Sequence, residues 1–144
     1  MTTVPAPASP ISFVIPVRND AARLRRCLAS IASNGAAGVE VIVVDNGSTD
    51  ESREVAASAG ARVLDAPGAS VSRLRNLGAA SASAELLAFV DADHTLSPDW
   101  VSHARRLMED PRVTAAGSLC HAPADGTWVQ RSYDALRRRA PARQ

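Results

Sequence analysis

The sequence lacks lysine and has few aromatic residues. All 16 basic residues are arginine, and with 15 acidic residues the formal net charge is +1. A charge so close to zero argues against the strongly basic surface that non-specific nucleic-acid binding needs, so we expect no nucleic-acid partner. Aromatic residues make up only 3% of the chain, whereas hydrophobic residues, many of them alanine, make up 46%. A core with so many small residues predicts helices packed closely against a sheet.

Long hydrophobic runs are absent, and there are only two cysteines. No stretch approaches the roughly 18 apolar residues that span a bilayer. Cys27 and Cys120 each lie in an apolar pattern without metal-ligand spacing, which predicts free, buried thiols in a reducing cytoplasm. Residues 1–10 contain three prolines and no apolar run, so they are interpreted as a flexible tail and not as a signal peptide. Residues 11–144 are long enough for one domain with its own core.

Apolar runs alternate with segments of helical periodicity along the chain. The runs are rich in β-branched residues and end at polar or turn-forming residues, as strands do. The segments between them begin near a capping residue and mostly end at glycine or proline, as helices do. The pattern predicts strands over residues 11–16, 39–44, 61–65, 85–90 and 113–120, and helices over 21–33, from Ser48 or Thr49 to Ala59, over 71–83, from Ser97 and Pro98 to Glu109, and over 128–139. This order predicts an α/β fold with a Rossmann-like, mostly parallel sheet and helices on both faces.

The fourth predicted strand ends in two carboxylates, Asp91 and Asp93. Acids this close repel each other and lose solvation when they are partly buried, so a positive group beside them is expected. We favour a divalent cation that bridges to a phosphate, because hard oxygen ligands suit Mg²⁺ or Mn²⁺. The alternative is a solvated pair of turn residues after a strand. His94 follows directly and could reach such an ion, although a lone histidine in a loop is usually just solvated.

Further polar residues follow other predicted strands. Arg18 and Asn19 come after the first strand, and Asp45 comes after the second. Ligands of parallel sheets bind beyond the carboxyl ends of the strands, so these residues and the acid pair are expected at one edge. The sequence therefore predicts a nucleotide-sized ligand site there.

Four segments form a recognisable set. They are Ile15-Pro16-Val17-Arg18-Asn19, Val43-Val44-Asp45-Asn46-Gly47-Ser48-Thr49-Asp50, Arg75-Asn76-Leu77-Gly78 and Phe89-Val90-Asp91-Ala92-Asp93. In this order and spacing they resemble the family 2 glycosyltransferases, which have the GT-A fold. The resemblance covers roughly residues 11–108, the donor-binding half of that family's domain.

The resemblance implies which residues bind the sugar donor. They are Pro16, Val17, Arg18, Asn19, Asp45, Arg75, Asn76, Asp91, Ala92 and Asp93. The loop after the first strand and Asp45 would hold the nucleotide base, and Arg75 and Asn76 would contact or shape the site. In the Asp-x-Asp motif, Asp93 would bind the Mg²⁺ or Mn²⁺ ion most directly, and Asp91 would contact the ribose or, through water, the ion. The implied activity is metal-dependent, inverting transfer of a sugar from a nucleotide diphosphate sugar, with UDP as the nucleotide, to a hydroxyl of an unknown glycan, lipid or small molecule.

Two features depart from the family pattern. The first motif commonly carries an aromatic residue where this chain has Val17 and Arg18, so stacking on the base is not expected there. Full members continue into an acceptor-binding region with an acidic general base, and no segment like its Gly-Gly-Phe-Asp or Glu-Asp elements is seen before Gln144. Of the late acids Asp125 and Asp134, Asp125 is a weak candidate for the base because it lies in an ordinary turn. The chain is interpreted as the amino-terminal, donor-binding part of a glycosyltransferase, with the acceptor half largely missing.

Other functions stay open at this point. A non-catalytic nucleotide-binding or interaction module, or an inactive truncated enzyme, would fit the missing acceptor half. A sugar nucleotidyltransferase would need a glycine-rich loop after the first strand, and a dinucleotide-binding domain a G-x-G-x-x-G motif; the sequence has neither. Arg137, Arg138 and Arg139 could meet a phosphate or an anionic lipid head group, which would allow peripheral membrane association, or simply form the solvated end of a helix.

Overall fold

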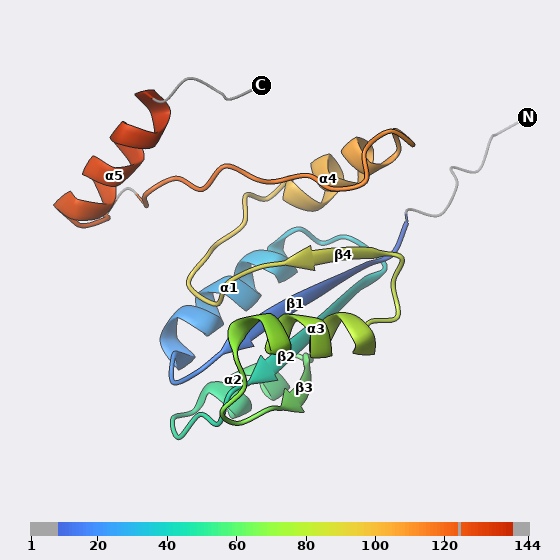
Figure 1. Cartoon of the computed structure of the whole chain (residues 1–144), viewed down its shortest axis with the longest axis vertical. Coiled ribbons are helices and arrows are strands. Elements are labelled where there is room, and N and C mark those ends of the chain that lie inside the picture. The colour runs from blue at the N-terminus through green and yellow to red at the C-terminus, as the bar shows by residue number, and fades with distance from the viewer. Residues whose placement is uncertain (1–8, 124, 140–144) are drawn as a thin grey trace, which may run out of the picture. The chain divides into compact units, whose positions relative to one another are not determined.

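The computed structural model describes residues 9–123 and 125–139 (Figure 1). The tail predicted for residues 1–10 lies outside this description except for its last two residues. The side chains at 137–139, and the phosphate or lipid contacts suggested for them, lie outside it as well. The chain divides into two compact units, Met1–Pro111 and Arg112–Gln144, which are described separately.

The first unit is built on one parallel sheet of four strands (Figure 1). In spatial order these are β3 Arg62–Asp65, β2 Val39–Asp45, β1 Ile11–Val17 and β4 Leu86–Phe89. Successive residues of a strand face opposite sides of the sheet, so the two central strands contribute to two cores. One core contains Phe13, Ile15 and Val43, and the other contains Val14, Ile42 and Val44.

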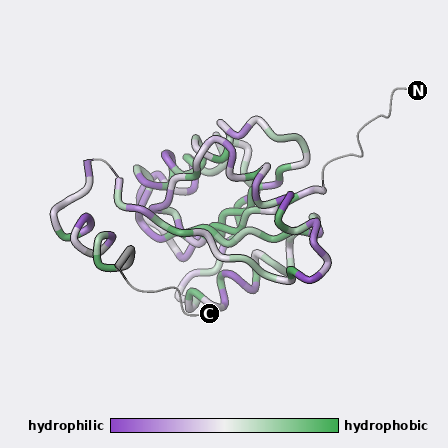
Figure 2. The backbone as a smooth tube through the Cα atoms, turned by 90° about the horizontal axis from the view of Figure 1, so that it is seen from above, coloured by the Kyte–Doolittle hydropathy of each residue, from purple (hydrophilic) through white to green (hydrophobic). Residues whose placement is uncertain are grey.

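Helices cover both faces of this sheet. α1 Ala21–Ser33, α2 Ser52–Ser58 and α4 Trp100–Met108 contribute to the core that contains Phe13, and α3 Val71–Ser81 to the other core. The apolar positions of α1 that face the sheet recur every three or four residues, as an amphipathic helix requires. Figure 2 shows hydrophobic residues along the strands and hydrophilic residues in the surrounding loops. The predicted parallel α/β fold with helices on both faces is confirmed.

Pro16 was expected to end the first strand, but β1 continues to Val17 and Pro16 pairs with Val44 of β2. Alternate residues of a parallel strand direct their backbone polar groups to opposite neighbours. Val14, two residues earlier, bonds toward β4, accepting from the Val90 amide at 3.2 Å. Since β4 ends opposite Val14, the missing N–H of Pro16 faces no strand, which is where a strand tolerates proline.

α4 begins later than predicted, at Trp100 and not at Pro98. The Val101 amide donates to Asn34 Oδ1 at 3.0 Å, and Asn34 Nδ2 donates to the Ser97 carbonyl at 3.2 Å. Asn34 lies at the end of α1. The cap of α4 therefore comes from another helix, and Ser97 is held in the turn before it.

The fifth strand predicted over residues 113–120 is wrong. This segment of the second unit has no regular secondary structure, and Cys120, predicted to be buried, is exposed. Small residues dominate the segment, with Gly117 near its middle, so it offers a sheet little apolar surface to bury. Cys27, in contrast, is buried as predicted.

The second unit holds the predicted final helix, α5 Trp128–Arg139. Thr127 Oγ1 accepts from the backbone N–H of Gln130 at 3.3 Å, and Gln130 Oε1 accepts from the backbone N–H of Thr127 at 2.8 Å. This reciprocal capping box explains why the helix begins here. Among the helices of the described residues, none is both long and apolar enough to cross a membrane.

The close packing of α3 on the sheet gives a testable prediction. A Cβ atom on Gly78 would lie 2.3 Å from Val14 Cγ1 and 3.2 Å from Val44 Cγ2. Gly78→Ala should therefore push α3 away from the sheet and lower the free energy of unfolding by about 1–3 kcal/mol, the usual range for overpacking, as measured by urea denaturation. Ala80→Ser, at an exposed position of the same helix, should change it by less than about 0.5 kcal/mol. Equal effects of the two substitutions would contradict this account.

Candidate functional site

Three strands end at the same edge of the sheet. Val17 of β1 pairs with Asp45 of β2, and Val14 pairs with Phe89 of β4. Because the strands are parallel, the loops that follow Val17, Asp45 and Phe89 all leave from that edge. The structure thus brings Arg18, Asn19, Asp45 and the acid pair to one edge of the sheet, as the sequence predicts.

Asp45 is fully buried, and only one of its carboxylate oxygens is paired. Oδ2 accepts from the amides of Gly47 at 3.1 Å and Ser48 at 3.0 Å, and Arg53 Nη1 lies 4.0 Å away. Oδ1 is buried without a hydrogen-bond partner among the described residues. Because leaving a buried acceptor unpaired costs about 1–3 kcal/mol, this oxygen points to a ligand that donates to it. Asp45 can cap its own turn and bind a ligand, since the two roles use different oxygens.

Asn19 joins the loop after β1 to the loop after β2. Its φ of 50° is a left-handed conformation that asparagine tolerates better than most residues. The backbone N–H of Asn19 donates to Ser48 Oγ at 2.9 Å, and Asn19 Oδ1 accepts from the backbone N–H of Thr49 at 2.7 Å. The side-chain oxygen of Asn19 is therefore used to hold the loop after β1 against the loop after β2.

The other residues predicted in the first loop differ in access. Pro16 is half-buried and Val17 is buried, and the Val17 carbonyl accepts from the Asn46 amide at 2.9 Å. Arg18 is exposed. Of these side chains, that of Arg18 is therefore the one best placed to reach a ligand.

Asp50 holds the starts of two helices, a role that the sequence analysis missed. Its Oδ2 accepts from the Ala21 amide at 3.0 Å, and its Oδ1 accepts from the Ser52 amide at 3.0 Å and hydroxyl at 2.5 Å. α2 accordingly begins at Ser52, and not directly after Ser48 or Thr49 as predicted. The hydroxyl of Ser52 first, and then the amide of Ala21, lower the pKa of the Asp50 carboxyl. No local pattern indicates the contact with α1.

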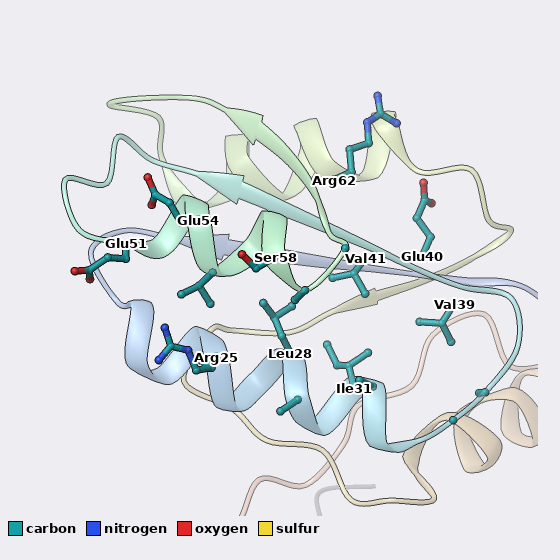
Figure 3. Close-up of a pocket in the computed structure, with 17 residues that line it drawn as sticks. Arg25, Leu28, Ile31, Val39, Glu40, Val41, Glu51, Glu54, Ser58 and Arg62 are labelled. Carbon is teal, nitrogen blue, oxygen red and sulfur yellow. The ribbon is translucent and has the colours of Figure 1, made fainter.

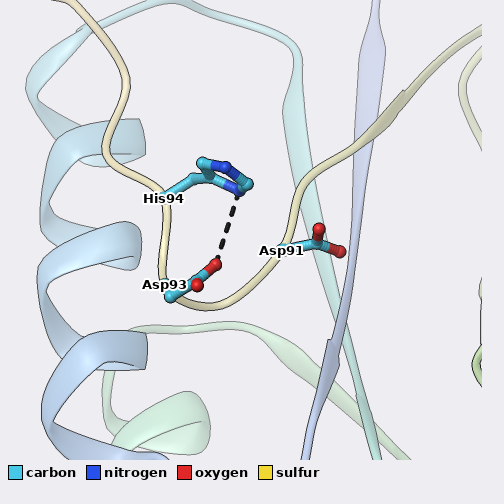
Figure 4. Close-up of side chains that lie close together, drawn as sticks. All are labelled: Asp91, Asp93 and His94. Atoms are coloured by element: carbon cyan, nitrogen blue, oxygen red, sulfur yellow. Dashed lines mark ion pairs between the residues drawn. The ribbon is translucent and has the colours of Figure 1, made fainter. Parts of the chain in front are cut away.

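The acid pair lies on a tight turn after β4 (Figure 4). The His94 amide donates to the Asp91 carbonyl at 3.0 Å, and Ala92 packs into the core. Asp91, Asp93 and His94 each offer one ligand atom, and these atoms lie within 4.8 Å of one another. Two carboxylates and an imidazole are a donor set that fits a divalent cation. We call residues 91–94 the acid turn.

Arg75 of α3 lies beside the acid turn. Its Nη2 is 2.6 Å from Asp91 Oδ1, so it offsets part of the repulsion between Asp91 and Asp93. Arg75 Nε is buried without a hydrogen-bond partner among the residues that the structure describes. Asn76, the next residue of the helix, is exposed. An ion pair therefore joins the Arg-Asn-x-Gly segment to the Asp-x-Asp segment.

Cys27 of α1 also lies next to the acid turn. Its Sγ is 3.9 Å from the Asp91 carbonyl oxygen. Burial, and then the negative charges of Asp93 and Asp91, raise the pKa of the Cys27 thiol to about 12. A protonated thiol is neither a metal ligand nor a nucleophile at neutral pH. The sequence predicts the burial of Cys27 but not this location.

The residues considered for a general base belong to the second unit. Asp125 is exposed in a turn before α5. Asp134 forms an ion pair with His121, with 3.5 Å between Oδ1 and Nδ1. The base role of Asp125 stays a prediction.

An open groove lies elsewhere on the first unit, between α1 and α2 (Figure 3). It has a volume of about 990 Å³, with Leu28, Ile31 and Val41 in its lining and Arg25 and Glu54 among the charged residues around it. None of the predicted site residues lines it. We place the functional site at the carboxyl edge, because ligands of open α/β sheets bind there.

A family model described as glycosyl transferase family 2 matches residues 12–143, nearly the whole chain. The chain belongs to glycosyltransferase family 2. The family predicted from the four motif segments is therefore confirmed.

Relatives of this family 2 chain include named glycosyltransferases. The pre-mycofactocin glycosyltransferase of Mycobacterium tuberculosis is 32% identical over 130 residues, which are 88% of this chain and 27% of that protein. The structure of S. aureus TarS matches with a TM-score of 0.65 and 19% identity, over 81% of this chain and 40% of that one. Glucosyl-3-phosphoglycerate synthase from Mycobacterium tuberculosis, in complex with Mn²⁺, UDP and glucosyl-3-phosphoglycerate, matches with a TM-score of 0.55 and 28% identity, over 74% of this chain and 40% of that one.

These structures confirm the predicted GT-A fold. The chain spans less than half the length of the curated relatives that it matches. What it shares with them is therefore the family and the fold of one part of each protein.

Asp50 gives a prediction about pH dependence. Because its pKa in the folded protein is lowered from 3.8, its charge stabilises the fold above that value, and the contribution is lost as the pH falls through the lowered folded-state pKa. Asp50→Asn should therefore lower the Tm at pH 7 and make the Tm depend less on pH roughly between pH 5 and pH 2, as measured by circular dichroism. Glu51→Gln, at the exposed neighbouring position, should keep the wild-type profile. A wild-type profile in Asp50→Asn would contradict the capping role.

Proposed function

We propose that this chain binds the donor of a glycosyltransferase that moves a sugar from a nucleotide diphosphate sugar to an acceptor hydroxyl. The observation that carries the proposal is that Asp45 Oδ1, a buried acceptor without a partner in the described residues, shares a sheet edge with the acid turn. The first group suits a nucleobase and the second suits a cation on a diphosphate. The Mn²⁺ and UDP in the synthase that is 28% identical support this class of donor.

Asp45 is proposed to recognise the base. A base that presents an N–H group can donate to Oδ1 while Oδ2 keeps its bonds to Gly47 and Ser48. Uracil has such a group, and UDP is the proposed nucleotide. Because Asp45 is fully buried, a small movement of the loops around it is part of this proposal. One of these loops begins at Ala66, whose amide bonds to the Asp45 carbonyl at 2.8 Å.

Asp93 and Asp91 are proposed to hold a Mg²⁺ or Mn²⁺ ion. Asp93 is the more direct ligand, because one oxygen of Asp91 is shared with Arg75. A divalent cation held by these two carboxylates would supply positive charge that neutralises the diphosphate and stabilises the negative charge growing on it as the sugar leaves. Arg75 and the exposed Arg18 add positive charge at this edge, and guanidinium groups suit phosphate oxygens.

Sugar transfer is proposed to be a direct displacement with inversion. The acceptor hydroxyl must lose its proton to a base, for which Asp125 is the candidate in this chain. The cytoplasmic location, the peripheral membrane association and the chemical class of the acceptor stay predictions.

Replacement of Asp93 tests the metal site. Asp93→Asn removes the charge that binds the cation, so calorimetry should detect no Mn²⁺-dependent affinity for UDP, while circular dichroism should show an intact fold. Glu85→Gln is a matched control, because Glu85 is exposed just before β4, at the opposite edge of the sheet. It should bind UDP like the wild type. Unchanged UDP affinity in Asp93→Asn would remove the metal role assigned to this residue.

A modified nucleotide tests base recognition by Asp45. UDP methylated at the uracil N–H cannot donate to Oδ1, and it should bind roughly 10-fold to 100-fold more weakly than UDP, because hydrogen bonds to charged groups contribute about 1.5–3 kcal/mol. Asp45→Asn should also weaken UDP binding. The two losses should not add when combined, because both remove the same bond. Additive losses in calorimetry would show that the base binds elsewhere.

Activity measurements separate an enzyme from a binding module. The chain is incubated with UDP-glucose and Mn²⁺, with and without added sugar acceptors, and release of UDP is measured. UDP release that Asp93→Asn abolishes would support catalysis by this chain. Tight UDP binding without donor hydrolysis or transfer would favour the non-catalytic nucleotide-binding module instead.

A further inference from the structure

His94 is the third side chain of the acid turn, and the Asp-x-Asp motif does not account for it. Its amide bonds to the Asp91 carbonyl at 3.0 Å, which folds the chain so that His94 returns toward Asp91. Its Nδ1 lies 3.5 Å from Asp93 Oδ1, and 41% of its side chain is exposed. Figure 4 shows the ring and the Asp93 carboxylate facing each other. The imidazole is therefore partly exposed and lies beside the Asp93 carboxylate (Figure 4).

The three ligand atoms are close enough to share one ion. They lie within 4.8 Å of one another. Two ligands on opposite sides of an ion are about 4.2 Å apart, twice a metal–oxygen distance of about 2.1 Å. The side chains of Asp93 and His94 are partly exposed. Small torsional changes within their rotamers can therefore bring the ligand atoms from the observed separation to the one that a shared ion needs.

Neighbouring groups do not supply a nitrogen or sulfur ligand in place of His94. The Cys27 thiol is fully buried in the core with its Sγ against the Asp91 carbonyl, and it is not among the ligand atoms that lie within 4.8 Å of one another. Arg75 carries a permanent positive charge and holds one oxygen of Asp91. His103, the other histidine of the first unit, pairs with Asp99 at 3.2 Å. Within the described part of the first unit, His94 is the nitrogen donor of the acid turn.

We propose that His94 binds the divalent cation together with Asp93 and Asp91, and that its imidazole makes the site select Mn²⁺ over Mg²⁺. This inference rests on the proposed donor-binding function. Mg²⁺ demands oxygen ligands and keeps several of its waters, whereas an imidazole nitrogen favours first-row transition ions. Carboxylates alone suit both ions, so the histidine supplies the discrimination.

Pulsed electron paramagnetic resonance of Mn²⁺ bound to the whole chain, with and without UDP, tests the ligand directly. The wild type should show hyperfine coupling to a ligating imidazole nitrogen, and His94→Gln should lose it. His103→Gln and His121→Gln remove the other two of the three histidines and should keep it. No coupling in the wild type, coupling that survives in His94→Gln, or loss of coupling in either control would overturn the assignment.

Ion selectivity is the second readout. In calorimetry, the ratio of Mn²⁺ affinity to Mg²⁺ affinity should fall at least about tenfold in His94→Asp, because an oxygen replaces the nitrogen ligand and even changes outside the ligand set alter metal affinity by about 10-fold to 100-fold. Glu85→Gln should keep the wild-type ratio. An unchanged ratio in His94→Asp would overturn the proposed selectivity.

The two proposals fail in different ways. Mn²⁺-dependent UDP binding that requires Asp93 but comes without imidazole coupling would contradict the role of His94 alone. Imidazole coupling from His94, together with UDP binding that does not depend on Mn²⁺, would contradict the proposed donor site but would still support the metal site. Absence of Mn²⁺ binding by the wild type would overturn both.

Discussion

The ion pair between Arg75 and Asp91 places a positive charge beside two carboxylates, those of Asp91 and Asp93, that would otherwise only repel each other. Asp91 and Asp93 follow the end of β4 with one residue between them. Their negative charges help to raise the pKa of the Cys27 thiol. The Arg75 guanidinium, 2.6 Å from Asp91, places a positive charge against this cluster. Both partners are between a third and a half exposed, so the pair adds about 0–1 kcal/mol to stability at most. Its main effect is to fix where the Asp91 carboxylate lies.

Arg75 reaches the acid turn from α3, a helix that packs very close to the sheet. Residues three apart lie on the same side of a helix, so Gly78 faces the sheet on the side from which Arg75 extends. A side chain at Gly78 would overlap Val14. The Arg-Asn-x-Gly segment thus supplies both the positive charge of Arg75 beside the acid turn and the small Gly78 that lets α3 pack close to the sheet. The abundance of alanine is not a feature of the core, which consists mostly of valine, isoleucine and leucine, with Ala56, Ala88 and Ala92 as its buried alanines.

The sequence was sufficient to predict the parts of the fold that depend on local patterns. Strand ends at Asp45 and before Asp91 were predicted because apolar runs stop there, and parallel topology then required both residues at one edge. Contacts between distant segments could not be predicted in this way. Asp50 caps α1 from another loop, and Asn34 caps α4 from the end of α1. The strand predicted over residues 113–120 was wrong for a different reason, because the small residues and the glycine in this segment offer a sheet little apolar surface to bury.

The order of strands limits what the edge can bind. β1 lies between β2 and β4, so the end of β2 with Asp45 and the end of β4 with the acid turn are separated by about 10 Å, two strand spacings. A lone cation, with or without a phosphate on it, could engage only the second group, and a free base only the first. A nucleoside diphosphate carries its base and its phosphates on either side of a ribose, and it is of the right length to use both. Its ribose would then cross the end of β1, where Asn19 ties the first loop to the second. The unpaired oxygen of Asp45 and the acid turn therefore favour one extended ligand over two small ones.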